Sequence, residues 1–181
     1  MGALAGRNRI GQNSLVNAKR AKAVREFLAT LPDAKRAGLR ETPARVSAAW
    51  DELLSGYGGD PKKLTAGALF LAESHDEILV AGLHFHSVCE HHLLPFFGTA
   101  EIRYTPGKRI LGLSKFPAVV QLFSRRLQVQ ERLTAQIADA LAGVNQPRRL
   151  EVTLAARHLC LEMRGQRAAG ELVTTARRGR G

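Results

Sequence analysis

The spacing of the apolar residues changes from helical to strand-like and back along this chain, and no other feature constrains its fold more. Helical segments repeat apolar residues every three to four positions, whereas strands alternate them or carry short apolar runs. The helical segments cover residues 17–31, 38–56, 119–126 and 129–143, and the strand-like segments cover residues 76–88, 96–106, 108–114, 149–165 and 171–176. This order of helices, strands, helices and strands predicts an α+β domain with an antiparallel sheet.

Local signals predict where several of these elements begin and end. Asn17 is a candidate N-cap of the first helix, and Thr42-Pro43 suits the start of the second. Pro106-Gly107 predicts the turn of a hairpin between segments 96–106 and 108–114. Gly143 predicts the end of the last helix.

We expect one domain, because no internal repeat and no long linker divides the chain. The domain covers residues 17–176, with a helical hairpin at 17–56 and the core at 76–176. Residues 1–16 are predicted to form a flexible tail, and residues 177–181 a short basic tail.

The composition excludes several classes of protein. The 181 residues, of which 45% are hydrophobic, suffice for one packed core. The apolar run ILVAGL (78–83) is far too short to cross a bilayer. The first residues lack the apolar segment of a secretory signal, so we expect a cytoplasmic protein, without a membrane partner, whose two cysteines stay reduced.

A crowded segment, CEHH, follows the strand predicted at 76–88 and indicates a metal site. The C-x-x-H spacing of Cys89 and His92 lets one tight turn aim both side chains at a single ion. Cys160 is a third soft ligand. Three protein ligands are typical of a catalytic zinc site, which keeps a fourth position for water.

Two other interpretations of these residues stay open at this point. A closed structural zinc site would need a fourth ligand, for which the sequence offers His84, His86 or His91. The cysteines and histidines could instead be ordinary buried residues.

Two further positions are candidates for a site. Strand alternation predicts that His158 shares a face with Cys160, where a histidine could act as a general acid or base. Gln130 and Glu131 stand at the start of the helix predicted at 129–143. A pocket carboxylate could pair with the N1–H and amino edge of guanine, although a helix-start glutamate is more often a solvated group that favours the helix dipole.

Several segments, in this order, are similar to the GTP cyclohydrolase I family. They are ETPARV (41–46) with a following ELLSG, FHSVCEHHLLPFFG (85–98), GLSK (112–115), RRLQVQERLTAQI (125–137) and HLCLEMRG (158–165). The similarity extends from about residue 20 to residue 176. The resemblance implies an enzyme that opens the imidazole ring of GTP, releases formate and recloses the skeleton to 7,8-dihydroneopterin triphosphate, the first step of tetrahydrofolate and pterin biosynthesis.

The resemblance also implies roles for individual residues. Zinc would be held by Cys89, His92 and Cys160, with water as the fourth ligand. Protons would be moved by His91 and His158. Guanine would be bound by Glu131 with Gln130 beside it, and the ribose and phosphates would face Ser114, Lys115, Arg164 and Arg45.

The family has the tunnelling fold, in which helices pack on one face of an antiparallel sheet, and assembles as a toroidal homodecamer with active sites between subunits. Two positions depart from its pattern. Ala118 and Ala48 stand where the family usually has an arginine and a lysine that meet the triphosphate. Each lost charge-assisted hydrogen bond is worth about 1.5–3 kcal/mol, so recognition of the phosphate tail is expected to be weaker.

Three hypotheses of function follow. The first is a zinc-dependent GTP cyclohydrolase I, and the second is the same chemistry on a guanine nucleotide or nucleoside with a shorter tail, in a specialised pterin or deazaguanine pathway. The third is a basic, zinc-stabilised module that binds nucleic acid, which the net charge of +11 allows. The third is disfavoured because no aromatic residues are interleaved with the basic ones and no nucleic-acid motif is present.

Overall fold

The computed structural model describes residues 4–179, with side chains from residue 15 onward. The chain divides into two compact units, Met1–Glu52 and Leu53–Gly181, which we describe separately. No helix in the described part of the chain is both long and apolar enough to cross a membrane.

Unit 1 consists of two helices joined by a short connection. Its elements are α1 (Leu4–Ala29), the 3-10 helix η1 (Ala37–Leu39) and α2 (Thr42–Leu53), whose last residue already belongs to unit 2. Asp51 of α2 accepts hydrogen bonds from Asn17 Nδ2 at 2.7 Å and from Arg20 at 2.6 Å. The Ser47 hydroxyl donates to the Asn17 carbonyl at 3.0 Å. These bonds hold α2 against the middle of α1.

The predicted helix start at Asn17 is wrong, because α1 already begins at Leu4. Residues 4–16, predicted to belong to a flexible tail, are helical, and residues 1–3 lie outside the described residues. Nucleation is the unfavourable step of helix formation, and each added residue then gains a hydrogen bond. A helix anchored at Asn17 and Arg20 can therefore extend through Gly6 and Gly11 despite their low propensity.

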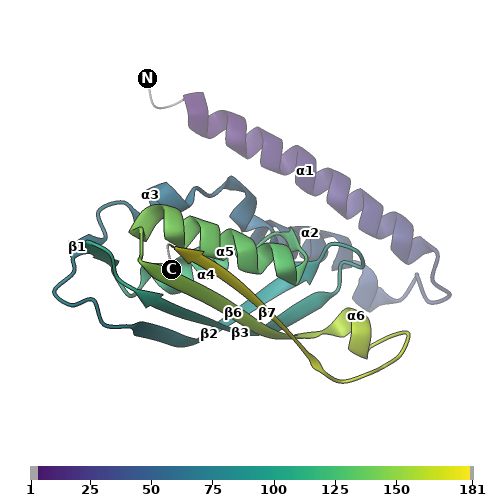
Figure 1. Cartoon of the computed structure of the whole chain (residues 1–181). Helices are drawn as coiled ribbons and strands as arrows, with labels where there is room; N and C mark the ends of the chain where they lie inside the picture. Colours follow the sequence, from purple (N-terminus) through teal and green to yellow (C-terminus); the bar gives the residue numbers. More distant parts are fainter. Residues whose placement is uncertain (1–3, 180–181) are drawn as a thin grey trace. The chain divides into compact units, whose positions relative to one another are not determined.

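Unit 2 is a five-stranded sheet with helices (Figure 1). Its elements are η2 (Ser55–Gly58), α3 (Pro61–Thr65), β1 (Leu69–Leu71), β2 (Ile78–Cys89), β3 (Pro95–Thr105), β4 (Arg109–Leu111), α4 (Lys115–Ser124), β5 (Leu127–Gln128), α5 (Gln130–Asn145), β6 (Arg149–His158), α6 (Leu159–Glu162) and β7 (Glu171–Gly179). The strand order is β5-β2-β3-β6-β7, antiparallel except for the parallel β5–β2 pair. The predicted α+β class is confirmed.

The core lies between this sheet and helices α4 and α5, which pack on one of its faces. Alternate residues of β6 are buried, from Leu150 to Ala156. Leu133, Ile137 and Leu141 of α5, spaced four apart, are also buried. Burying one such side chain contributes about 1.5–3 kcal/mol, so the two apolar periodicities of the sequence meet in a single core. Helices on one face of an antiparallel sheet are also what the tunnelling fold requires.

The predicted hairpin about Pro106-Gly107 is wrong. β4 pairs with β1 in a separate two-stranded sheet, with Leu111 opposite Leu69. β3 is bonded on one edge to β2 and on the other to β6. It therefore has no free edge for β4.

Three predicted boundaries in the last third of the chain are also wrong. Gly143 lies inside α5, which continues to Asn145 because buried contacts outweigh the cost of about 1 kcal/mol for a helical glycine. The strand predicted at 149–165 ends at His158, where α6 begins. β7 continues to Gly179 instead of ending before a basic tail, because β6 pairs with it to that residue. Residues 180 and 181 lie outside the described part.

Gly98 should be the glycine of the sheet that tolerates a side chain least. A Cβ at this position of β3 would lie 1.9 Å from the Ala155 carbonyl oxygen of β6, so the two strands would have to move apart. We expect Gly98→Ala to destabilise the protein by about 3 kcal/mol and to lower the melting temperature. Gly143→Ala is the control, because nothing lies within 4 Å of a Cβ there. It should raise stability by about 0.5–1 kcal/mol, and equal effects of the two substitutions would contradict the close approach.

Candidate functional site

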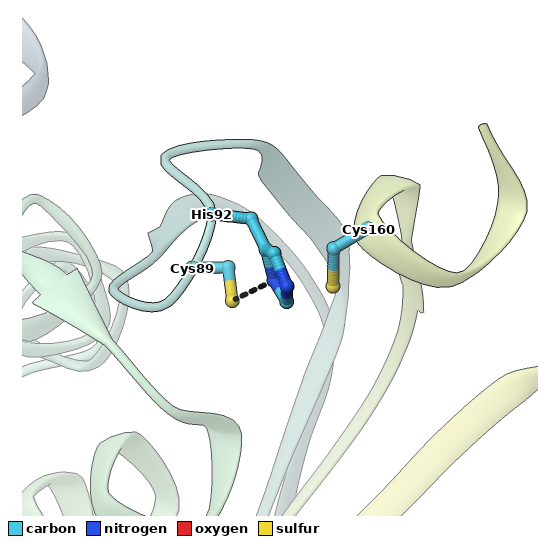
Figure 2. Close-up of side chains that lie close together, drawn as sticks. All are labelled: Cys89, His92 and Cys160. Atoms are coloured by element: carbon cyan, nitrogen blue, oxygen red, sulfur yellow. Dashed lines mark hydrogen bonds between the residues drawn. The ribbon is translucent and has the colours of Figure 1, made fainter. Parts of the chain in front are cut away.

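The structure brings together Cys89, His92 and Cys160, the three residues predicted to hold a metal. One donor atom of each side chain lies within 4.8 Å of the others. Cys89 Sγ is 3.8 Å from His92 Nδ1, and Figure 2 shows Cys160 pointing toward this pair from a separate short helix. Cys89 is buried, Cys160 is half-buried and His92 is exposed. The arrangement therefore opens to solvent on the His92 side.

A tight turn after β2 aims Cys89 and His92 at the same point. Two backbone hydrogen bonds of 2.9 Å close the turn. The Leu93 N–H donates to the Cys89 carbonyl oxygen, and the Cys89 N–H donates to the Leu94 carbonyl oxygen. Leu93 takes a left-handed conformation, with φ of 54°. A non-glycine residue in this region is strained and persists only where its surroundings hold it. Here the two hydrogen bonds across the turn hold it.

Cys160 reaches the site by another route than the one predicted. Strand alternation with His158 does not place it, because β6 ends at His158 and Cys160 lies in α6. Burial, together with the neighbouring Cys89 thiol, raises the pKa of the Cys160 thiol. A metal ion would have to displace this proton, since thiolates and not thiols bind metals.

The donor set fits zinc. Zinc accepts thiolates and imidazole at about 2.0–2.3 Å, so donors sharing one ion lie within roughly twice that distance of each other. The observed limit of 4.8 Å is close to this value. Among the described residues this trio is the only group of three or more potential ligands.

The alternative of a fourth protein ligand is not supported. His84 and His86 are exposed, whereas Phe85 and Cys89 of the same strand are buried, so the two histidines lie on the opposite face of β2 from Cys89. The side chain of His91 is 63% exposed, with Nε2 3.8 Å from a carboxylate oxygen of Glu90.

His158, the predicted proton carrier, is the last residue of β6 and stands two residues before Cys160 of the metal trio. Its ring is stacked on Phe96, with centroids 4.6 Å apart and planes 3° from parallel. Its Nε2 is 2.8 Å from Gln130 Oε1. Burial lowers the pKa of His158, while the charges of Glu131 and Glu162 act in the opposite direction. The net shift favours a neutral imidazole.

The predicted guanine-binding pair separates into two environments. Glu131 is exposed in the first turn of α5, close enough to His158 for its charge to act on that ring. The Gln130 side chain is 1% exposed, and both ends of its amide are hydrogen-bonded inside the protein. Only Glu131 of the two therefore presents its side chain to solvent.

The predicted phosphate-binding residues are spread over three elements. Arg164 follows α6, and its charge acts on Cys160. Ser114 and Lys115 stand at the start of α4, with Ser114 exposed. Among the described residues, no hydrogen bond or ion pair links these two to the metal trio. Arg45 lies in α2 of unit 1 and is exposed there.

Two residues of the surroundings escaped prediction from the sequence. Arg132 makes a 2.6 Å ion pair with Glu90 and so ties the CEHH turn to α5. Its position inside the QVQERL segment next to Glu131 was a usable signal. Phe96 supports the ring of His158. Nothing in an apolar strand distinguishes such a residue from any other core phenylalanine.

Comparison with known proteins gives a consistent result. A profile of the family described as GTP cyclohydrolase I matches residues 20–180. A protein named GTP cyclohydrolase 1 from Deinococcus radiodurans is 46% identical over 157 residues, which are 86% of this chain and 73% of that protein. One of the same name from Campylobacter lari is 48% identical over 146 residues, or 80% of this chain and 77% of that protein.

Among solved structures, the chain is similar to the apo form of the archaeosine synthase QueF-Like. The TM-score is 0.47 at 16% sequence identity, covering 57% of this chain and 96% of that chain.

Metal content should depend on the trio and not on His91. We expect the wild-type protein to bind about one zinc ion per chain. Cys160→Ser should lose most of this metal, because a hydroxyl is a poor zinc ligand, and should still fold. His91→Ala is the control and should keep the metal. The measurement is elemental analysis of the purified proteins, and loss of zinc in His91→Ala, or none in wild type at neutral pH, would contradict the assignment.

Proposed function

The chain belongs to the GTP cyclohydrolase I family, and we propose that it is a zinc-dependent enzyme that opens the imidazole ring of GTP. The reaction would hydrolyse the ring at C8, release formate and reclose the product to 7,8-dihydroneopterin triphosphate, the first step of pterin and tetrahydrofolate biosynthesis. The observation that carries the proposal is the metal trio, with the half-buried His158 two residues before its Cys160. Ring hydrolysis needs an activated water and a proton carrier at one place.

Each group of the site has a task in this proposal. Cys89, His92 and Cys160 would hold zinc, which when bound supplies a Lewis acid for activating water. His158, whose pKa is lowered by burial, would accept a proton and return it to the opening ring. His91 is exposed next to the trio and would serve as a second proton carrier at the open side of the site.

Recognition of the substrate is assigned to the exposed charged groups. The Glu131 carboxylate would accept two hydrogen bonds from N1–H and the 2-amino group of guanine. Gln130 would contribute its backbone, since its side chain is used inside the protein. The ribose and phosphates would be bound by Ser114, Lys115, Arg164 and Arg45.

We also propose that the protein works as a homo-oligomer, a toroidal decamer, in the cytoplasm and without a membrane or nucleic-acid partner. β7 is the last strand of the sheet order, so in the described chain its outer edge has no partner strand. Val173 of β7 is 59% exposed. An unprotected edge with apolar side chains is the kind of surface that pairs with another subunit.

A second candidate, a guanine nucleotide or nucleoside with a shorter phosphate tail, is favoured by two positions. Ala118 lies in the first turns of α4, three residues after Lys115. Ala48 lies in α2 and is exposed. Neither methyl group can bind a phosphate, so two cations of the family pattern are absent.

Formate release with GTP tests the main proposal. We expect formate and a fluorescent pterin from GTP but not from ATP, because adenine would leave the Glu131 carboxylate facing a ring-nitrogen lone pair. His158→Ala and His91→Ala should each lower turnover by about 10²–10⁴-fold and retain zinc. His75→Ala, an exposed histidine remote in sequence from the motifs, is the control and should be fully active. Absence of formate with every guanine nucleotide would overturn the proposal.

The two alanines should reduce discrimination between phosphate tails. Each missing cation is worth about 1.4 kcal/mol or more, which is tenfold in specificity. We expect kcat/KM for GTP to exceed that for GDP or GMP by no more than about one or two decades. Ala118→Arg should raise the preference for GTP about tenfold, whereas the uncharged control Ala118→Gln should not. A wild type that prefers GTP over GMP by many decades, together with no effect of Ala118→Arg, would exclude the shorter-tail candidate.

A further inference from the structure

The orientation of the buried Gln130 amide is determined by its neighbours. Gln130 Nε2 lies 3.0 Å from the Leu154 carbonyl oxygen, 2.8 Å from the Leu172 carbonyl oxygen and 3.1 Å from Thr174 Oγ1. Backbone carbonyl oxygens only accept hydrogen bonds. The end of the amide that faces them must therefore be the NH₂ group, and the opposite end must be the oxygen.

The two threonines beside the amide agree with this orientation. The Thr134 hydroxyl donates to the Gln130 carbonyl at 2.8 Å, so its hydrogen is used there. The 2.6 Å bond between Thr134 and Thr174 must then be donated by Thr174. With its own hydrogen used, Thr174 Oγ1 can only accept from Gln130 Nε2. The two hydrogens of the Gln130 amide are therefore shared among three acceptors, namely the Leu154 and Leu172 carbonyl oxygens and Thr174 Oγ1.

This network also determines the protonation pattern of the neighbouring histidine. Gln130 Oε1, an acceptor, lies 2.8 Å from His158 Nε2. Two acceptors at that distance would repel each other, so Nε2 must carry a hydrogen. We infer that Gln130 is a positioning residue, whose amide oxygen holds the His158 ring with Nε2–H directed toward it and leaves Nδ1 as the nitrogen available to the substrate.

Two further observations support this assignment. No hydrogen bond to His158 Nδ1 is found among the described residues, whereas Nε2 is bonded. Stacking on Phe96 holds the plane of the ring. Since the plane and one nitrogen are held, Nδ1 has a single direction, as a general base requires. The hydrogen on Nε2 is assigned from geometry alone, and only the role of Nδ1 toward the substrate rests on the proposed function.

The network explains why a glutamine is placed in a position sealed from solvent. Gln130 begins α5 and binds the backbone of both β6 and β7 through its NH₂ group. The same side chain therefore joins three elements and aims His158, so a displacement of α5 against the sheet would also turn the imidazole.

The tautomer can be measured in the zinc-loaded wild-type protein without any activity. Solid-state NMR of ¹⁵N-histidine-labelled protein separates protonated from bare ring nitrogens, and a difference spectrum against His158→Asn assigns the signals of His158. We expect a single neutral form protonated on Nε2. A neutral form protonated on Nδ1 would overturn the inference. An Nε2–H form in a protein that releases no formate would refute the proposed function and leave the tautomer standing.

Substitution then separates positioning from structural support. Gln130→Met removes the acceptor, so a second tautomer of His158 should appear and kcat should fall about 10–100-fold, with KM changed only a few-fold. Thr174→Val is the matched control, because it breaks the same network but spares the bond between Gln130 and His158. It should lower the melting temperature and keep both the tautomer and kcat.

Two outcomes would contradict the positioning role. One is a Gln130→Met protein in which His158 stays entirely Nε2–H while kcat falls no further than in Thr174→Val. The other applies if Gln130→Met does not fold. Gln130→Asn then serves as the second variant, because it keeps an amide but its shorter side chain withdraws the oxygen from Nε2, and a His158 ring that stays entirely Nε2–H in this variant would refute the role.

Discussion

The register of β2, β3 and β6 is the constraint on which the rest of the structure depends. Ser87 of β2 pairs with Phe96 of β3, and Phe96 pairs with His158 of β6. This row places the turn that carries Cys89 and His92 next to the strand end that leads to Cys160. A shift of one residue in either pairing would turn these side chains to the opposite face of the sheet. The metal trio and the stacked histidine would then be lost together.

Helix α5 packs on the sheet and is hydrogen-bonded to its strands, which stabilises this pairing. Its buried residues complete the core, and Gln130 at its first position binds the backbone of β6 and β7. Arg132, two residues later, holds Glu90 of the CEHH turn. The start of one helix therefore contacts the CEHH turn, the sheet and His158. A site built from segments about seventy residues apart is therefore bonded to α5 on one side and open to solvent at His92.

The residues of the candidate site fall into a partly buried group and an exposed group. Burial acts on the two inner groups, because it lowers the pKa of His158 and raises the pKa of the Cys160 thiol. The groups assigned to the substrate, Glu131 and Arg164, are exposed. Buried groups are held by fixed dipoles and contacts, whereas exposed groups remain available for a charged ligand.

Much of this protein could be predicted from its sequence, because the signals are local. Apolar periodicity predicted the α+β class and the main elements, and C-x-x-H spacing with a distant cysteine predicted the metal trio. The tertiary structure alone decided the pairing of β4 with β1, the continuation of α5 past Gly143, the helix that carries Cys160, and the burial of Gln130. Each of these depends on which strand edges and faces remain uncovered after distant segments have packed, and no local pattern of residues encodes that.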